Sequence, residues 1–126
     1  MISGRSKGDQ IKPTVKIVVV EPVSKIILNC IGWGLEEENI PFEVKETMND
    51  SAVLLAKKEA DNSKLNIGIC INGVSKKIIL HHRDLVVDNP LFTIMVQDYK
   101  EENLKILGIN AARLVKGKPL VFKQAV

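Results

Sequence analysis

The sequence has few aromatic residues, two cysteines and no long apolar run, and each shortage excludes a class of protein. Phe, Trp and Tyr make up 4% of the 126 residues while 45% are hydrophobic, so one domain with an aliphatic core is expected. No apolar run approaches the ~18 residues that a membrane span requires. No N-terminal segment has the order of a signal peptide either. We therefore predict a cytoplasmic protein without a membrane partner.

The cysteines and the charges point to neither disulfides nor nucleic acid. Cys30 and Cys70 lie in separate apolar stretches and do not form a C-x-x-C pair, so buried free thiols are expected. The net charge is only +3, and the lysines lack the interleaved aromatic residues of a nucleic-acid platform. We predict solvated lysine faces and no nucleic-acid partner.

Familiar catalytic and phosphate-binding motifs are also missing. "EPVSK" follows the first apolar run where a glycine-rich phosphate loop would stand, so we expect no nucleotide bound by this chain. The glycines of "GWG", at 32–34, lie in a predicted helix, where they more often allow close packing. His81 and His82 are adjacent, would point to opposite faces of a strand, and cannot share one metal. We expect one packed and one exposed histidine in a hydrogen-bonded turn, and no catalytic residue.

The periodicity of the remaining sequence predicts an α/β fold. "TVKIVVVE" is typical of a buried parallel strand, whereas the segment from Ser24 has helical spacing and a capping residue. "NG" at 72–73 indicates a hairpin, and Pro90 fits the start of a short helix. The prediction is a small single-domain sandwich with a mixed, mainly parallel sheet over 14–126, preceded by a flexible N-terminal arm at 1–13. Its strands are expected at 14–21, 42–46, 65–71, 76–82 and 120–122, and its longer helices at 24–38, 50–62 and 101–116.

Three glutamates stand at the end of the first predicted helix, where the helix dipole disfavours negative charge. On a helical wheel Glu36 points to water, and Glu38 falls beyond the last regular turn or caps it. Glu37 aligns with Ile26, Cys30 and Trp33 in a second, partly apolar stripe. Such a stripe suits a partner-binding edge, because Trp is enriched at interface centres. A tryptophan covering its own domain beside a solvated Glu37 fits the residues equally well.

A resemblance favours the partner-binding interpretation. "GLEEENIPFEV", "LNIGICI", "DNPLF" and "NAARLVKGKPL" occur in this order, and the stretch from about Val15 to Leu120 resembles the small subunit of the diol or glycerol dehydratase-reactivating factor. The resemblance implies a fold akin to the dehydratase medium subunit and a small subunit without catalytic residues. The ATPase is then expected in a large partner subunit, in an assembly of two large and two small subunits. One departure is Asn39, which stands where glycine is expected but tolerates the same left-handed backbone.

The same resemblance implies a chaperone-like function and a site. The complex would exchange its small subunit for the similar subunit of an adenosylcobalamin-dependent dehydratase, releasing damaged cobalamin. The client would act on glycerol or propane-1,2-diol, in the cytoplasm or inside a bacterial microcompartment. Glu37 would ligate a divalent metal, Mg²⁺ or Ca²⁺, shared with the large subunit, and Trp33 would join it at the partner interface.

The alternative is an accessory or medium subunit of the dehydratase itself, helping to bind cobalamin. A medium subunit is expected to carry additional segments around this domain, whereas this chain ends soon after Leu120.

Overall fold

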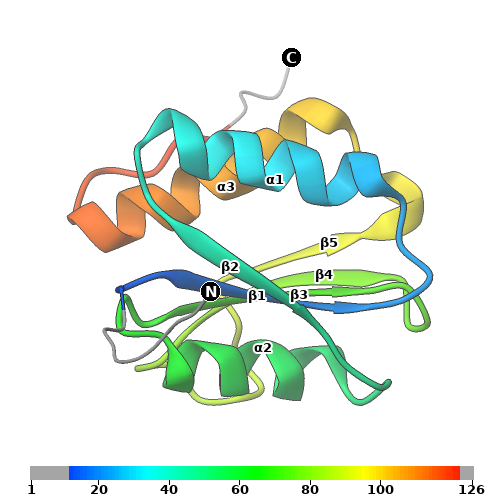
Figure 1. Cartoon of the computed structure of the whole chain (residues 1–126). Helices are drawn as coiled ribbons and strands as arrows, with labels where there is room; N and C mark the ends of the chain where they lie inside the picture. Colours follow the sequence, from blue (N-terminus) through cyan, green and yellow to red (C-terminus); the bar gives the residue numbers. More distant parts are fainter. Residues whose placement is uncertain (1–11, 123–126) are drawn as a thin grey trace, which may run out of the picture.

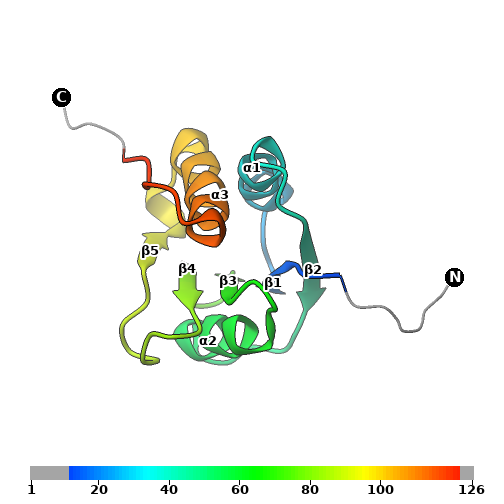
Figure 2. The same ribbon diagram turned by 90° about the vertical axis from the view of Figure 1, so that its left-hand side faces the viewer.

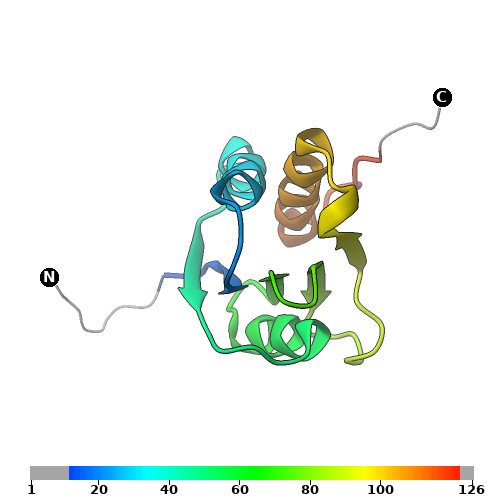
Figure 3. The same cartoon turned by 90° about the vertical axis from the view of Figure 1, so that its right-hand side faces the viewer.

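The computed structural model describes residues 12–122, which form a sheet covered by helices on both faces (Figure 1). Helices α1 and α3 lie on one face and α2 on the other, an arrangement that both end views show (Figures 2 and 3). No helix in 12–122 is long and apolar enough to cross a membrane. The elements are β1 (Val15–Val20), α1 (Lys25–Glu37), β2 (Phe42–Glu46), α2 (Ala52–Asn62), β3 (Ile67–Asn72), β4 (Lys77–His82), β5 (Phe92–Met95), the 3-10 helix η1 (Val96–Asp98) and α3 (Glu101–Lys116).

The sheet has the strand order β2-β1-β3-β4-β5 and is mixed, as predicted. β1 pairs in parallel with β2 and β3, whereas β3–β4 and β4–β5 are antiparallel. Parallel and antiparallel pairs are therefore equal in number, and the sheet is less parallel than the sequence suggested. The difference comes from β5, which adds a second antiparallel pair at the far edge.

The core is aliphatic on both faces of the sheet, as the scarcity of aromatic residues predicted. Alternate residues of β1 divide between the two layers, with Ile17 under α1 and α3 and Val18 under α2. β3 is buried along its whole length, as expected for a central strand. Cys30 and Cys70 are buried free thiols in different layers, which confirms that prediction.

The helix ends follow the signals in the sequence. The hydroxyl of Ser24 accepts a hydrogen bond from the backbone N–H of Ile26 and caps α1. Asn39 has a φ of 61°, and the N–H of Ile40 donates to the carbonyl of Leu35 at 3.0 Å, which closes α1 as a left-handed motif. Asparagine thus takes the place that glycine was expected to fill.

Two local predictions are wrong. Residues 92–95 form β5 rather than a helix starting at Pro90, and a short helical turn, η1, follows only at 96–98. Residues 120–122 form no strand, although the backbone of Val121 exchanges two hydrogen bonds of 2.7 Å with the side-chain amide of Asn110. The predicted β3–β4 hairpin is confirmed, and its turn spans 73–76 with Lys76 as the left-handed residue.

The predicted arm lies almost wholly outside the described residues. Residues 1–11 and 123–126 are not described, so the boundaries of the arm and of the domain stay predictions. Lys12 and Pro13 are exposed and irregular, whereas Thr14 is already buried.

Two glycines set the distance between α1 and α3. A Cβ atom on Gly34 would lie 2.2 Å from the carbonyl oxygen of Lys105 and 2.7 Å from the nitrogen of Ile109. A Cβ atom on Gly108 would lie 2.1 Å from the carbonyl oxygen of Ile31. The helices therefore meet backbone to backbone, which confirms the packing role predicted for the second glycine of "GWG". Gly32 is also buried, because the Phe42 ring of β2 covers it.

Candidate functional site

The place where an open α/β sheet usually binds its ligand is occupied by backbone. With the order β2-β1-β3, that place is the crevice outside the carboxyl ends of β1 and β3. The N–H of Gly73 donates to the carbonyl of Val20 at 2.7 Å, and a Cβ atom on Gly73 would lie 1.8 Å from the carbonyl oxygen of Pro22. Only glycine permits this contact. The turn after β3 thus packs directly on the loop after β1.

The two histidines serve the turn after β4. His81 is fully buried, and its Nε2 lies 3.0 Å from the carbonyl oxygen of Val87. Its Nδ1 accepts a hydrogen bond from the N–H of His82 at 3.0 Å, so backbone groups satisfy both ring nitrogens. His82 is partly exposed, and its Nδ1 accepts from the N–H of Asp84 at 3.0 Å. The prediction of one packed and one exposed histidine in a hydrogen-bonded turn is confirmed.

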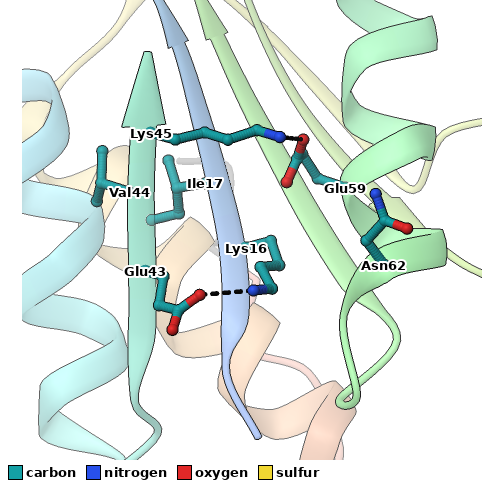
Figure 4. A pocket seen from close by; sticks show the side chains of 7 residues that line it. All are labelled: Lys16, Ile17, Glu43, Val44, Lys45, Glu59 and Asn62. Carbon is teal, nitrogen blue, oxygen red and sulfur yellow. Dashed lines mark hydrogen bonds and ion pairs between the residues drawn. The ribbon is translucent and has the colours of Figure 1, made fainter. Parts of the chain in front are cut away.

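An open hollow of about 450 Å³ lies beside α2 over the β1–β2 edge, and its charges are already paired (Figure 4). Lys16 pairs with Glu43 at 2.5 Å. Lys45 reaches across β1 to Glu59 at 2.9 Å, and the Glu59 side chain is only 3% exposed. Each carboxylate here has an ammonium partner within the chain. Neither carboxylate is therefore free to act as a general base or to bind a charged substrate in this hollow.

The three glutamates at the end of α1 have three different environments. Glu36 is exposed, as the helical wheel predicted. Glu37 pairs with Lys105 of α3 at 2.5 Å. Glu38 caps α1, lies 3.2 Å from Lys116, and has its pKa lowered by the hydrogen bond from that lysine. Cations of α3 thus offset the cost of negative charge at this helix end. The sequence does not reveal these partners, because they lie about 70 residues away along the chain and only packing brings them close.

The predicted stripe on α1 is divided between the interior and the surface. Cys30 is 2% exposed, and burial raises the pKa of its thiol. Trp33 is 49% exposed and the Glu37 side chain 50%. Residues four positions apart on a helix are neighbours on its surface, so Trp33 and Glu37 share one exposed flank. An exposed indole beside a carboxylate forms the candidate site of this chain.

Glu37 suits a hard divalent cation only as a partial ligand. Within residues 12–122, no three His, Cys, Asp or Glu side chains gather closely enough to hold a metal ion. Mg²⁺ and Ca²⁺ take six or more oxygen ligands, so most of them would have to come from water or another chain. Lys105 holds the carboxylate and would have to withdraw. Its side chain is long and 44% exposed, so it can swing into water.

Comparison with known proteins identifies the family. Residues 12–121 match the family model described as dehydratase medium subunit. A propanediol dehydratase-reactivating factor small subunit of Citrobacter freundii is 39% identical over 89 residues, 68% of this chain and 72% of that one. The diol dehydratase-reactivating factor small subunit of Klebsiella michiganensis is 31% identical over 112 residues, 89% of this chain and 86% of that one.

Two solved structures extend the comparison. A diol dehydratase-reactivating factor complexed with ADP and Mg²⁺ contains a chain that superposes with a TM-score of 0.82 at 30% identity, covering 89% of this chain and 100% of that one. A glycerol dehydratase reactivase chain gives a TM-score of 0.81 at 32% identity, covering 88% and 98%. The chain therefore belongs to the dehydratase medium-subunit family, as one of the small subunits of diol or glycerol dehydratase-reactivating factors.

Proposed function

We propose that this chain is the non-catalytic small subunit of a chaperone-like reactivating factor for an adenosylcobalamin-dependent diol or glycerol dehydratase. Its partner is a large subunit that carries the ATPase, in an assembly of two large and two small subunits. The complex works in the cytoplasm, including the interior of a microcompartment. The relatives' names support the assembly, and the ADP and Mg²⁺ in a related complex support the nucleotide dependence.

One observation supports subunit exchange as the mechanism. The family model is named for a dehydratase subunit, whereas the relatives are subunits of reactivating factors, so one domain type serves both assemblies. Proteins of the same fold can compete for one docking surface on a third protein. The small subunit leaves, the large subunit takes hold of the dehydratase's similar subunit, and damaged cobalamin is released.

The flank of α1 is the proposed contact with the large subunit. Trp33 is half exposed and supplies a rigid apolar anchor of the kind enriched in interface centres. Glu37 supplies one carboxylate toward a divalent ion, Mg²⁺ or Ca²⁺, and Lys105 withdraws from it on assembly. When bound, the ion supplies the positive charge that joins Glu37 to oxygen ligands of the large subunit.

Reconstitution with the large subunit tests this function. The two chains, expressed together, are expected to co-purify. With ATP, Mg²⁺ and intact cofactor, the complex is expected to restore activity to an inactivated dehydratase, whereas this chain alone restores none. Failure to co-purify, or full reactivation by the large subunit alone, would contradict the proposal.

The second candidate is a cobalamin-binding medium subunit of the dehydratase, which the name of the family model favours. It predicts that this chain restores activity to a dehydratase that lacks its own medium subunit. It also predicts that the purified complex keeps bound cobalamin, which its visible absorption spectrum would show. The reactivating-factor proposal predicts no dehydratase activity from that mixture.

A further inference from the structure

Strand β2 forms an exposed edge of the sheet. Only Phe42 is partly buried, and the other four residues of the strand are exposed. Val44, an apolar residue, is 42% exposed. An edge of this kind presents a row of unpaired backbone groups to another chain.

The backbone groups that face outward follow from the pairing with β1. The N–H of Val15 donates to the carbonyl of Pro41, and the N–H of Thr47 donates to the carbonyl of Val19, both at 3.0 Å. Odd-numbered residues of this segment therefore face β1. By the alternation of a strand, Phe42, Val44 and Glu46 present their N–H and C=O groups outward. Within residues 12–122 these groups have no hydrogen-bond partner.

We propose that a second copy of this chain pairs with this edge, antiparallel, with each Val44 opposite its own counterpart. This register joins the outward groups of the two copies in about six backbone hydrogen bonds. It also sets Glu43 opposite Lys45 of the second copy, and the reverse. A shift of two residues in one direction sets Glu43 opposite Glu43, and in the other Lys45 opposite Lys45. Of these three registers, only the Val44-centred one avoids like charges directly opposite, which are destabilising.

The charges on this edge extend into a network across the pair. Lys16 holds Glu43 and Lys45 holds Glu59 on the α2 side of the sheet (Figure 4). With Glu43 beside Lys45 of the second copy, the two pairs join into one row of alternating charge. The row consists of Lys16 and Glu43 of one copy followed by Lys45 and Glu59 of the other, and two-fold symmetry repeats it. Networks of this kind stabilise more than isolated exposed pairs.

The other face of the edge adds apolar contact. Val44 pairs with Ile17, which packs under α1 and α3, so its side chain lies on that face of the sheet. The two valines would cover each other there. The remaining edge strand, β5, has only four residues, no charged residue, and a Phe92 ring already in contact with Phe122.

This surface is separate from the proposed contact with the large subunit. Gly32 of α1 faces Phe42 of β2, whereas Glu37 reaches toward α3 on the other flank of the same helix. The self-pairing does not depend on the proposed function.

Cysteine cross-linking of the full chain tests the register. In the proposed pair the two Val44 Cα atoms lie about 5.5 Å apart, within the range that a disulfide spans. Val44→Cys is therefore expected to form a covalent dimer under mild oxidation. Glu46→Cys is the matched control, because Glu46 has the same outward backbone and lies on the same face. Its two copies would stand roughly 14 Å apart, too far for a disulfide.

We expect Val44→Cys to cross-link about tenfold faster than Glu46→Cys, since only the first pair meets the geometric limit. Equal rates, or no dimer from either variant, would overturn the proposal. Cross-linking that appears only after deletion of residues 1–11 would also overturn it, because the edge would not be free in the full chain.

Sedimentation gives a second readout without new thiols. Val44→Pro removes one outward N–H and no bond to β1, so it is tolerated at an edge and leaves the fold intact by circular dichroism. The unmodified chain is expected to dimerise as its concentration rises to about 1 mM, because two short strands bury less than a standard interface. The variant is expected to stay monomeric. A wild-type chain that is monomeric throughout, or a variant that dimerises equally, would refute the pairing.

Discussion

Substituting Gly34 by alanine tests the backbone contact between α1 and α3. The three atoms nearest to the new Cβ atom would be backbone atoms of α3: the carbonyl oxygen of Lys105 at 2.2 Å, the nitrogen of Ile109 at 2.7 Å and the carbonyl carbon of Gly108 at 3.0 Å. Backbone atoms inside a helix cannot rotate aside as a side chain does. Normal contact distances therefore require the helices to separate by roughly 1 Å.

The expected cost follows from two opposing terms. Overpacking costs about 1–3 kcal/mol, and a clash with helix backbone belongs at the upper end of that range. Alanine regains about 1 kcal/mol of helix propensity relative to glycine. We therefore expect Gly34→Ala to lower the free energy of unfolding by about 2 kcal/mol.

Urea unfolding followed by circular dichroism measures this loss. Gly32→Ala is the matched control, because its Cβ atom would lie 2.8 Å from the end of the Phe42 ring, which can shift. The smaller clash and the gain in helix propensity should nearly cancel, so we expect a change within about 0.5 kcal/mol. Equal stability of Gly34→Ala and the wild type would refute the tight contact between α1 and α3.

Two further predictions concern the ionisation of buried and paired groups. Burial raises the pKa of Cys70 to about 12. Ellman's reagent at pH 8 should therefore react with this thiol only as the chain unfolds. Rapid reaction in the native state would contradict the buried position of Cys70. Because Lys116 lowers the pKa of Glu38 below its ordinary value of 4.5, the pair stabilises the fold above that pH, and the contribution is lost as the pH falls through the lowered pKa. Lys116→Met should flatten the dependence of unfolding free energy on pH in this acidic range, and an unchanged profile would show that the pair does not form in solution.

A third prediction concerns nucleotide. Calorimetry on the isolated chain should detect no micromolar binding of ATP, because no glycine-rich loop or phosphate-binding lysine follows β1. Tight ATP binding by this chain alone would contradict the assignment of the ATPase to the large subunit.

Local sequence signals predicted most of the fold. Ser24 and Asn39 take the capping roles that the side chain of Ser24 and the tolerance of Asn39 for left-handed backbone suggested. The succession of β1 to β4 and the three longer helices along the chain was also predicted from periodicity. β5 was missed because Pro90 suggested a helix start, whereas the strand is set by pairing with β4. Such pairing is a tertiary effect that local patterns do not encode.

The candidate site was less accessible to sequence reasoning. The helical wheel predicted correctly that Glu36 points to water and that Trp33 and Glu37 share a flank. It could not predict that Lys105 and Lys116 of α3 approach Glu37 and Glu38, because those contacts depend on the close crossing at Gly34. The role of Glu37 toward a metal came from resemblance and stays a prediction.

The most direct test of the proposed function is the affinity of this chain for the large subunit with and without divalent ions. Glu37→Ala should leave the isolated chain folded, weaken assembly as much as chelation does, and make further chelation ineffective. Glu36→Ala should assemble normally. Lys105→Ala should assemble at least as well as the wild type, because removing the ammonium frees the carboxylate of Glu37 for the ion. Equal losses from Glu37→Ala and Lys105→Ala, or assembly of the wild type indifferent to chelation, would show that Glu37 acts only through its salt bridge within the chain.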